Sequence, residues 1–200
     1  MKESTTKFEG YILAGGKSSR MGADKANLKF GGETFLTHAA RTLAPVCEGR
    51  IKIILNTNQA APENYECIYD IFPERGALGG IHAALNDCRS DWAIILAVDL
   101  PYVLSEAIER LKQFALESNE FSAVVPVQND GRLQPLCAVY RAADCLPKLE
   151  DLLSRTTSAS VKDFLELVPT SRVEQDRLTT KAVEELFFNV NLPADFQLLI

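Results

Sequence analysis

The chain has 200 residues, of which 46% are hydrophobic and 24% charged, a composition typical of a soluble globular protein with a sizeable core. Its net charge of -6 argues against general nucleic-acid binding, which needs a basic surface. The first residues lack the apolar run of a signal peptide, and the longest apolar run, 92–98, is too short to cross a membrane. We therefore expect a cytoplasmic protein that binds neither nucleic acid nor membrane.

In the first half of the chain, short apolar runs alternate with segments whose apolar residues recur at helical spacing. The expected strands are 11–14, 51–55, 67–69 and 92–98, and the expected helices are 35–43 and 81–88. The run 92–98 is apolar on both faces, as expected of a central strand that helices cover on both sides. This alternation predicts an α/β fold with a mostly parallel sheet and helices on both faces.

The second half continues with a predicted helix after Ser105, which is a candidate N-cap, and its residues Ile108, Leu111 and Ala115 are expected to face inward. Further strands are expected at 123–127, at 133–140 with an interruption at Pro135, and at 171–173; further helices are expected at 142–153 and 161–165. The sequence has no internal repeat or long linker. We therefore expect a single domain over residues 1–200.

The first predicted strand ends in Gly15-Gly16, and the basic residues Lys17, Arg20 and Lys25 follow before the next apolar run. Glycines let a backbone approach phosphate oxygens closely, and successive N–H groups in such a loop form a concavity that binds anions. The loop has neither the Walker A spacing nor the Gly-x-Gly-x-x-Gly dinucleotide fingerprint. Phosphate binding is the prediction, although a Gly-Gly pair beside lysines also suits an ordinary turn.

Polar side chains end three other predicted strands: Asn56 the second, Asp70 the third, and Asp99 the central one. Parallel strands would bring them to the sheet edge where open α/β folds bind ligands. Mg²⁺ takes a few carboxylates together with phosphate oxygens and water, and Asp99 supplies one such carboxylate. Taken alone, an aspartate before Leu100-Pro101 more often belongs to a turn or a helix cap. The shared edge favours a nucleotide and metal site.

The pattern Leu-x-Gly-Gly-x-x-x-Arg-Met-Gly-x-Asp-Lys, from Leu13 to Lys25, resembles the start of the molybdenum cofactor guanylyltransferases, a MobA-like nucleotidyltransferase family. Other motifs of that family match in order along the chain, at Gly79-Gly80 with the following helix, Asp99-Leu100-Pro101, Gln134-Pro135-Leu136, and Asn189-Val190-Asn191 with Pro193 and Asp195. Leu192 departs from the usual Thr, and Gly79 stands where the family often has Ala. The resemblance implies a Rossmann-like fold of the nucleotide-diphospho-sugar transferase type.

The resemblance also implies an activity: transfer of GMP from GTP to molybdopterin carrying molybdenum, with Mg²⁺ as cofactor and diphosphate released. Arg20, Lys25 and Asp99 would be catalytic, with Asp99 also the metal ligand. Gln134, Asn189 and Asn191 are candidates for the acceptor side, and delivery to molybdoenzymes or their chaperones would follow. By family position, the nucleotide would be bound by Leu13, Ala14, Gly15, Gly16, Lys25, Asn56, Asp70, Gly79 and Asp99.

Two alternatives stay open. A related enzyme could use CTP with molybdopterin, or a nucleoside triphosphate with a sugar phosphate; Gly15-Gly16 favours guanine because the related cytidylyl enzymes more often read Leu-Ala-Ala-Gly. A non-catalytic module could instead bind a nucleotide or a partner. The five cysteines are scattered and the two histidines, His38 and His82, lie far apart, so we expect no zinc site and free thiols in a reducing compartment.

Overall fold

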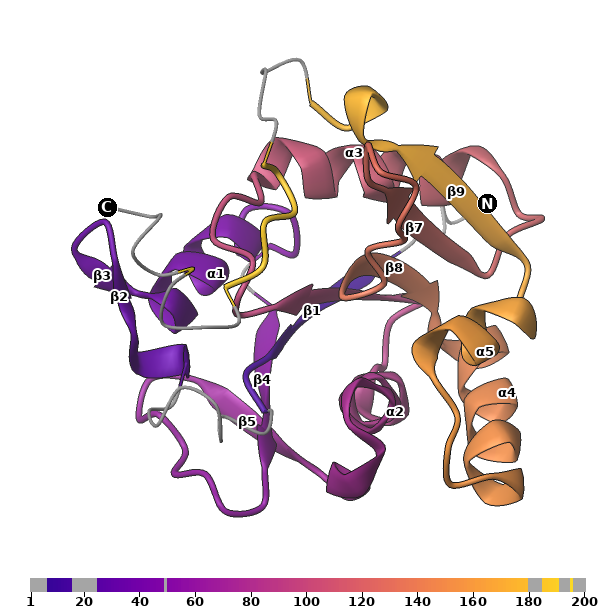
Figure 1. The fold of residues 1–200 in the computed structure, drawn as a ribbon, viewed down its shortest axis with the longest axis horizontal. Helices are drawn as coiled ribbons and strands as arrows, with labels where there is room; N and C mark the ends of the chain where they lie inside the picture. Colours follow the sequence, from indigo (N-terminus) through magenta and orange to yellow (C-terminus); the bar gives the residue numbers. More distant parts are fainter. Residues whose placement is uncertain (1–6, 16–24, 49, 180–184, 191–194, 196–200) are drawn as a thin grey trace, which may run out of the picture.

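The structure, a computed structural model, describes residues 7–15, 25–48, 50–179, 185–190 and 195 (Figure 1). A seven-stranded sheet has the order β5-β4-β1-β6-β8-β7-β9. Strands β5, β4, β1 and β6 run parallel, β8 is antiparallel to β6 and β7, and β9 is parallel to β7. The strands are β1 (Phe8–Leu13), β4 (Ile51–Asn56), β5 (Glu66–Asp70), β6 (Trp92–Ala97), β7 (Ala123–Val127), β8 (Cys137–Arg141) and β9 (Thr170–Glu174).

Helices cover both faces of this sheet, as Figure 1 shows, with α1 and α3 on one face and α2, α4 and α5 on the other. Every residue of β6 is buried, and its side chains alternate between the two apolar layers: Ile94 packs with the α1–α3 side and Ile95 with the opposite side. The mostly parallel α/β fold is thereby confirmed. The helices are α1 (Phe35–Leu43), α2 (Ala77–Asp87), α3 (Ser105–Glu117), α4 (Ala142–Arg155) and α5 (Val161–Glu166).

Short elements complete the described chain: the 3₁₀ turns η2 (Lys25–Asn27), η3 (Pro73–Arg75) and η4 (Gln175–Arg177), and a hairpin of β2 (Lys29–Phe30) and β3 (Glu33–Thr34). The hairpin leads into α1, whose first turn is capped because Thr34 Oγ1 accepts a hydrogen bond from the Thr37 N–H at 3.1 Å. Within these ranges, no helix is both long enough and apolar enough to cross a membrane.

Two sequence-based details are wrong. Ser105 is not the N-cap of α3; Leu104 holds that position, and the Ser105 hydroxyl instead donates to the Thr42 carbonyl at 2.7 Å. The predicted strand 133–140 begins only at Cys137, because the chain makes an isolated bridge from Leu133 to Val127 and then turns at Pro135, which has no N–H for a ladder.

Candidate active site

Four neighbouring parallel strands end at one edge of the sheet, and each ends in or is followed by a residue expected at the site. Asp70 ends β5, Asn56 ends β4, and Gly15 and Asp99 lie two residues beyond β1 and β6. Asn56 and Asp70 are partners in the β-ladder. With strands spaced by about 4.8 Å, the row from Asp70 to Asp99 extends over roughly 14 Å. The predicted convergence is confirmed for these residues, and the row suits an elongated ligand.

The end of β1 packs directly onto β4. The N–H groups of Ala14 and Gly15 both donate to the Ile54 carbonyl at 3.0 Å, and a Cβ at Gly15 would lie 2.9 Å from Asn56 Oδ1. Gln59, which sequence reasoning missed, ties the two strand ends together because its side chain donates to the Ala14 carbonyl at 3.1 Å and accepts from the Asn56 N–H at 2.8 Å. Gly15 therefore permits close packing here, and its own N–H is already engaged.

Leu13 and Ala14, expected to line the guanine site, bury their side chains at 7% and 5% exposure in the two apolar layers. Any contact with a nucleotide would therefore come from their main chain. Gly16 and Arg20 lie outside the described residues, as does Asn191. Lys25 begins η2, and only its backbone belongs to the described part. The predicted phosphate loop thus begins and ends at positions the structure describes, at Gly15 and at Lys25.

Asp70 is packed against the start of α2. Its side chain is 4% exposed, its Oδ1 accepts from the Phe72 N–H at 2.6 Å, and a Cβ at Gly79 would collide with its carboxylate and with the Phe72 carbonyl. Burial raises the pKa of Asp70, while the Phe72 N–H and the nearby His82 act in the opposite direction. His82 is buried at 4% exposure, and its ring packs edge-on against Phe72 with 4.9 Å between the ring centroids.

We expect Asp70→Asn to be more stable than the wild type at neutral pH. The pKa of Asp70 is raised in the folded state, so the folded protein holds this proton more tightly than the unfolded chain, and stability is lost as pH rises through the folded pKa. The advantage of Asn should fade as pH falls toward the unfolded pKa of about 3.9. Urea midpoints measured from neutral pH down to pH 4 check this.

The matched control is Asp130→Asn. Hydrogen bonds from Arg132 lower the pKa of Asp130, so its charge stabilises the folded state above the unfolded pKa, and removing that charge should cost stability at neutral pH. Asp130 is exposed, so the effect should be small. A benefit of Asp70→Asn that is equal at every pH would contradict the role assigned to the buried charge.

Asp99 lies at the other end of the row and contacts the C-terminal segment. The Val190 N–H donates to the Asp99 carbonyl at 3.0 Å. The Asn189 amide lies beside the carboxylate, and with its nitrogen turned toward Asp99 it donates to both oxygens at 3.0 Å. The two motif residues Asp99 and Asn189, which are distant in sequence, are therefore neighbours in space.

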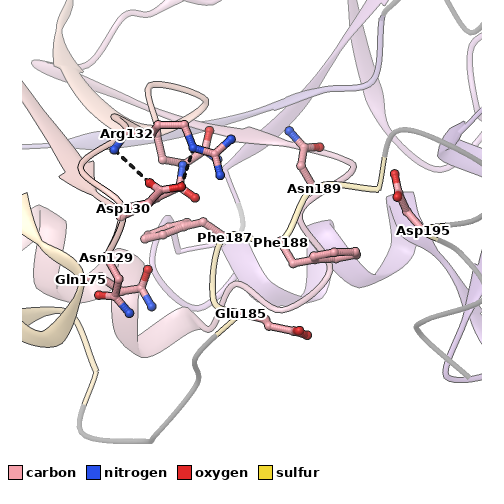
Figure 2. Close-up of a pocket in the computed structure, with 11 residues that line it drawn as sticks. Asn129, Asp130, Arg132, Gln175, Glu185, Phe187, Phe188, Asn189 and Asp195 are labelled. Carbon is pink, nitrogen blue, oxygen red and sulfur yellow. Dashed lines mark hydrogen bonds and ion pairs between the residues drawn. The ribbon is translucent and has the colours of Figure 1, made fainter.

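A pocket of about 600 Å³ opens beside Asn189 (Figure 2). Gln134, an expected acceptor-side residue, lines it at 7% exposure, and its side-chain amide has no hydrogen-bond partner among the described residues. Asp130 and Arg132 also line the pocket, and the Asp130 carboxylate accepts hydrogen bonds from the Arg132 backbone N–H at 3.0 Å and from Arg132 Nε at 2.6 Å. The lining residues are Gln128, Asn129, Asp130, Arg132, Gln134, Gln175, Glu185, Phe187, Phe188, Asn189 and Asp195.

Most of this lining was not found from the sequence. Gln134, Asn189 and Asp195 belong to motifs of the family that the sequence resembles, while the turn 128–132, Gln175 and the pair Phe187-Phe188 carry no spacing that points to a ligand. In the parts of the chain that the structure describes, no three His, Cys, Asp or Glu side chains lie close enough together to hold a metal ion.

Comparison with known proteins shows which family and which fold the chain is similar to. The profile of the MobA-like NTP transferase domain matches residues 10–174. A Carboxydothermus hydrogenoformans protein named probable molybdenum cofactor guanylyltransferase is 33% identical over 190 residues, which cover 94% of this chain and 93% of that protein. The crystal structure of molybdopterin-guanine dinucleotide biosynthesis protein A from Archaeoglobus fulgidus aligns with a TM-score of 0.80 at 23% identity, covering 96% of each chain.

A second solved structure is similar at the level of the fold. The 2-C-methyl-D-erythritol 4-phosphate cytidylyltransferase of Thermus thermophilus aligns with a TM-score of 0.67 at 18% identity, covering 94% of this chain and 95% of that one. Nucleotidyltransferases named for different bases and acceptors thus share this sheet and its helices. The fold alone therefore does not determine which base or acceptor is used.

Proposed function

This chain belongs to the MobA-like NTP transferase family, and we propose that it is a molybdenum cofactor guanylyltransferase. It would transfer GMP from GTP to molybdopterin carrying molybdenum, giving the guanine dinucleotide form of the cofactor and diphosphate. One observation carries the proposal: the row of strand ends from Asp70 to Asp99 continues, through Asn189, into a pocket large enough for a second substrate. The proposed setting is the cytoplasm, with delivery to molybdoenzymes or their chaperones as the next step.

The guanine base is proposed to lie at the end of the row near Asp70 and Asn56. Guanine presents two adjacent donors, its ring N–H and its 2-amino group, and an ionised carboxylate can accept from both. Cytosine offers no such pair of adjacent donors, so a carboxylate here favours GTP over CTP. Gly79 supports this reading because it lets α2 pack directly against the Asp70 turn.

The phosphates would extend past Gly15 toward Asp99, where we propose that Mg²⁺ binds. The residues fit the ion: Mg²⁺ prefers oxygen ligands from one or two carboxylates plus substrate phosphates. The Asn189 amide is 3.0 Å from both Asp99 oxygens, and turning it would place its oxygen beside them. When bound, the ion supplies positive charge to the phosphates as diphosphate leaves. Gly16, Arg20 and Lys25 are proposed to contribute N–H groups and cationic charge to the same phosphates.

In this reaction the residues of the chain mainly position the two substrates. The acceptor's phosphate oxygen is already an anion, so the barrier lies in bringing anions together and in stabilising the departing charge. Asp99 lies between the nucleotide row and the pocket, and Asn189 contacts both Asp99 and the pocket. An acceptor in the pocket would therefore present its terminal phosphate at the Asp99 end of the row.

The pocket suits the pterin part of the acceptor, because it combines amide side chains with Phe187 and Phe188, and a pterin is a flat heterocycle with an amide-like edge. We expect Gln134→Leu to raise the KM for the acceptor by roughly tenfold, about the cost of one or two lost hydrogen bonds, with the affinity for GTP unchanged. Acceptor titrations at saturating GTP measure it. Gln113→Leu, on α3, is the control. Equal losses for both substrates would contradict the assignment.

The reaction itself is tested by supplying GTP, CTP or ATP with Mg²⁺ and the acceptor, and measuring diphosphate and dinucleotide. Transfer from GTP alone is the expected result. Transfer from CTP would favour the cytidylyl alternative, which rests on likeness of fold. Binding of GTP, seen as a thermal shift, without any transfer would favour the non-catalytic module.

A further inference from the structure

Helix α4 contacts the turn between Asp70 and α2 through the side chain of Arg75. The guanidinium of the half-buried Arg75 donates through Nη1 to the Thr156 carbonyl at 2.6 Å and through Nη2 to the Leu153 carbonyl at 3.0 Å. These carbonyls belong to the C-terminal end of α4, where backbone oxygens lack partners within the helix and the helix dipole is negative. The Arg75 guanidinium carries a permanent positive charge and several N–H donors in one plane, so it suits the C-terminal end of α4.

The same arginine is linked to Asp70 by backbone hydrogen bonds. The Arg75 N–H donates to the Phe72 carbonyl at 2.8 Å, and the Phe72 N–H donates to Asp70 Oδ1 at 2.6 Å. A second contact from α4 reaches the turn through His82, whose Nε2 lies 3.7 Å from Glu150 Oε1 and whose ring packs edge-on against Phe72. The orientation of the Asp70 carboxylate therefore depends on where α4 holds residues 72–75.

We infer that Arg75 is a positioning residue for guanine selection: by clamping the Asp70 turn to the end of α4, it fixes the carboxylate that would accept from the base. The inference rests on the proposed function, because Asp70 must meet the base for its orientation to matter. Arg75 touches neither base nor phosphate in this scheme and acts only through Phe72 and Asp70. Its loss should therefore change which base is preferred more than it changes the transfer step.

The test compares GTP with ITP, whose base lacks the 2-amino group, through the ratio of their Kd values. Arg75→Ala should lower the preference for GTP by about fivefold to tenfold, a size typical of coupled neighbours. Arg75→Lys, which keeps a charged donor, should restore part of it. Arg155→Ala is the control, since Arg155 lies at the same end of α4 but pairs with Asp151 at 2.8 Å. This variant should keep the wild-type preference for GTP over ITP.

A double-mutant cycle separates positioning from a merely structural role. Asp70→Asn should itself lower the GTP preference, and in that background Arg75→Ala should lower it no further. If Arg75→Ala reduces the urea midpoint but leaves the GTP preference intact while Asp70→Asn abolishes it, Arg75 is only a helix cap and the inference is overturned. If Asp70→Asn also leaves the preference intact, the proposed base contact fails as well, so the two failures are distinguishable. If Arg75→Ala does not fold, the same measurement of GTP preference is made on Arg75→Lys.

Discussion

Asp99→Asn should lower the rate of GMP transfer by about 10²- to 10³-fold, comparable to the loss of one preorganised group that stabilises transition-state charge. The substitution removes the negative charge that would attract a metal ion but keeps the size of the side chain. The fold should survive, because the new amide can still pair with Asn189, and the Val190 N–H bonds to the backbone carbonyl of residue 99 in either protein. Single-turnover transfer, measured over a series of Mg²⁺ concentrations, gives the rate.

Asp91→Asn is the matched control for this substitution. Asp91 immediately precedes β6 at the opposite edge of the sheet, where its carboxylate accepts from the Lys7 N–H at 2.9 Å. The two aspartates thus flank one strand at its two ends, and only Asp99 lies on the side of the predicted site. We expect the Asp91 variant to transfer GMP at nearly the wild-type rate. Similar losses in both variants would point to damage of β6 and would end the metal assignment.

Lys25→Ala should slow transfer by about a hundredfold or more, because a permanent charge near the departing diphosphate is lost where phosphoryl transfer depends on electrostatics. The backbone of Lys25 is fixed at the end of the phosphate loop, since its neighbour Ala26 is buried at 5% exposure in the layer with α1. Lys25→Arg keeps the charge and should recover part of the rate. The rate at saturating substrates and the Kd for GTP are the quantities to measure.

Lys29→Ala controls for the loss of a lysine close in sequence. Lys29 is exposed on the short strand β2, and its removal should leave both the rate and the Kd within about twofold of wild type, as for most surface substitutions. If the two lysine variants behave alike, the charge at position 25 has no special place in the reaction, and the resemblance of the loop to the family would have misled the assignment.

The position of the residues proposed to bind the nucleotide could be predicted because it follows from the topology of the sheet. Alternating strands and helices predict parallel pairing, and parallel pairing brings the residues after each strand to one edge. Asn56, Asp70 and Asp99 could therefore be grouped from sequence alone, although no sequence signal indicated that the Gly15 N–H is taken by Ile54 or that Gln59 joins the strand ends.

The pocket could not be predicted in the same way. Its walls come from the turn before β8, from η4 and from the C-terminal segment, and β8 runs antiparallel to its neighbours. The edge rule applies to parallel strands, so it does not indicate where the side chains of Gln128 or Gln175 will meet. Ser105 shows a related limit, because a hydroxyl that suits a helix cap instead bonds to Thr42, a tertiary contact with no local signature.

The reversal of direction between β6 and β8 separates the residues proposed to bind the nucleotide from those proposed to bind the acceptor. Everything proposed to read the base belongs to β5, β4 and β1 and their loops, whereas everything proposed to hold the acceptor follows β6 in the chain. Replacing the segment 128–134 with that of a relative of different acceptor preference should thus change the acceptor that is used and leave the proposed preference for GTP unchanged.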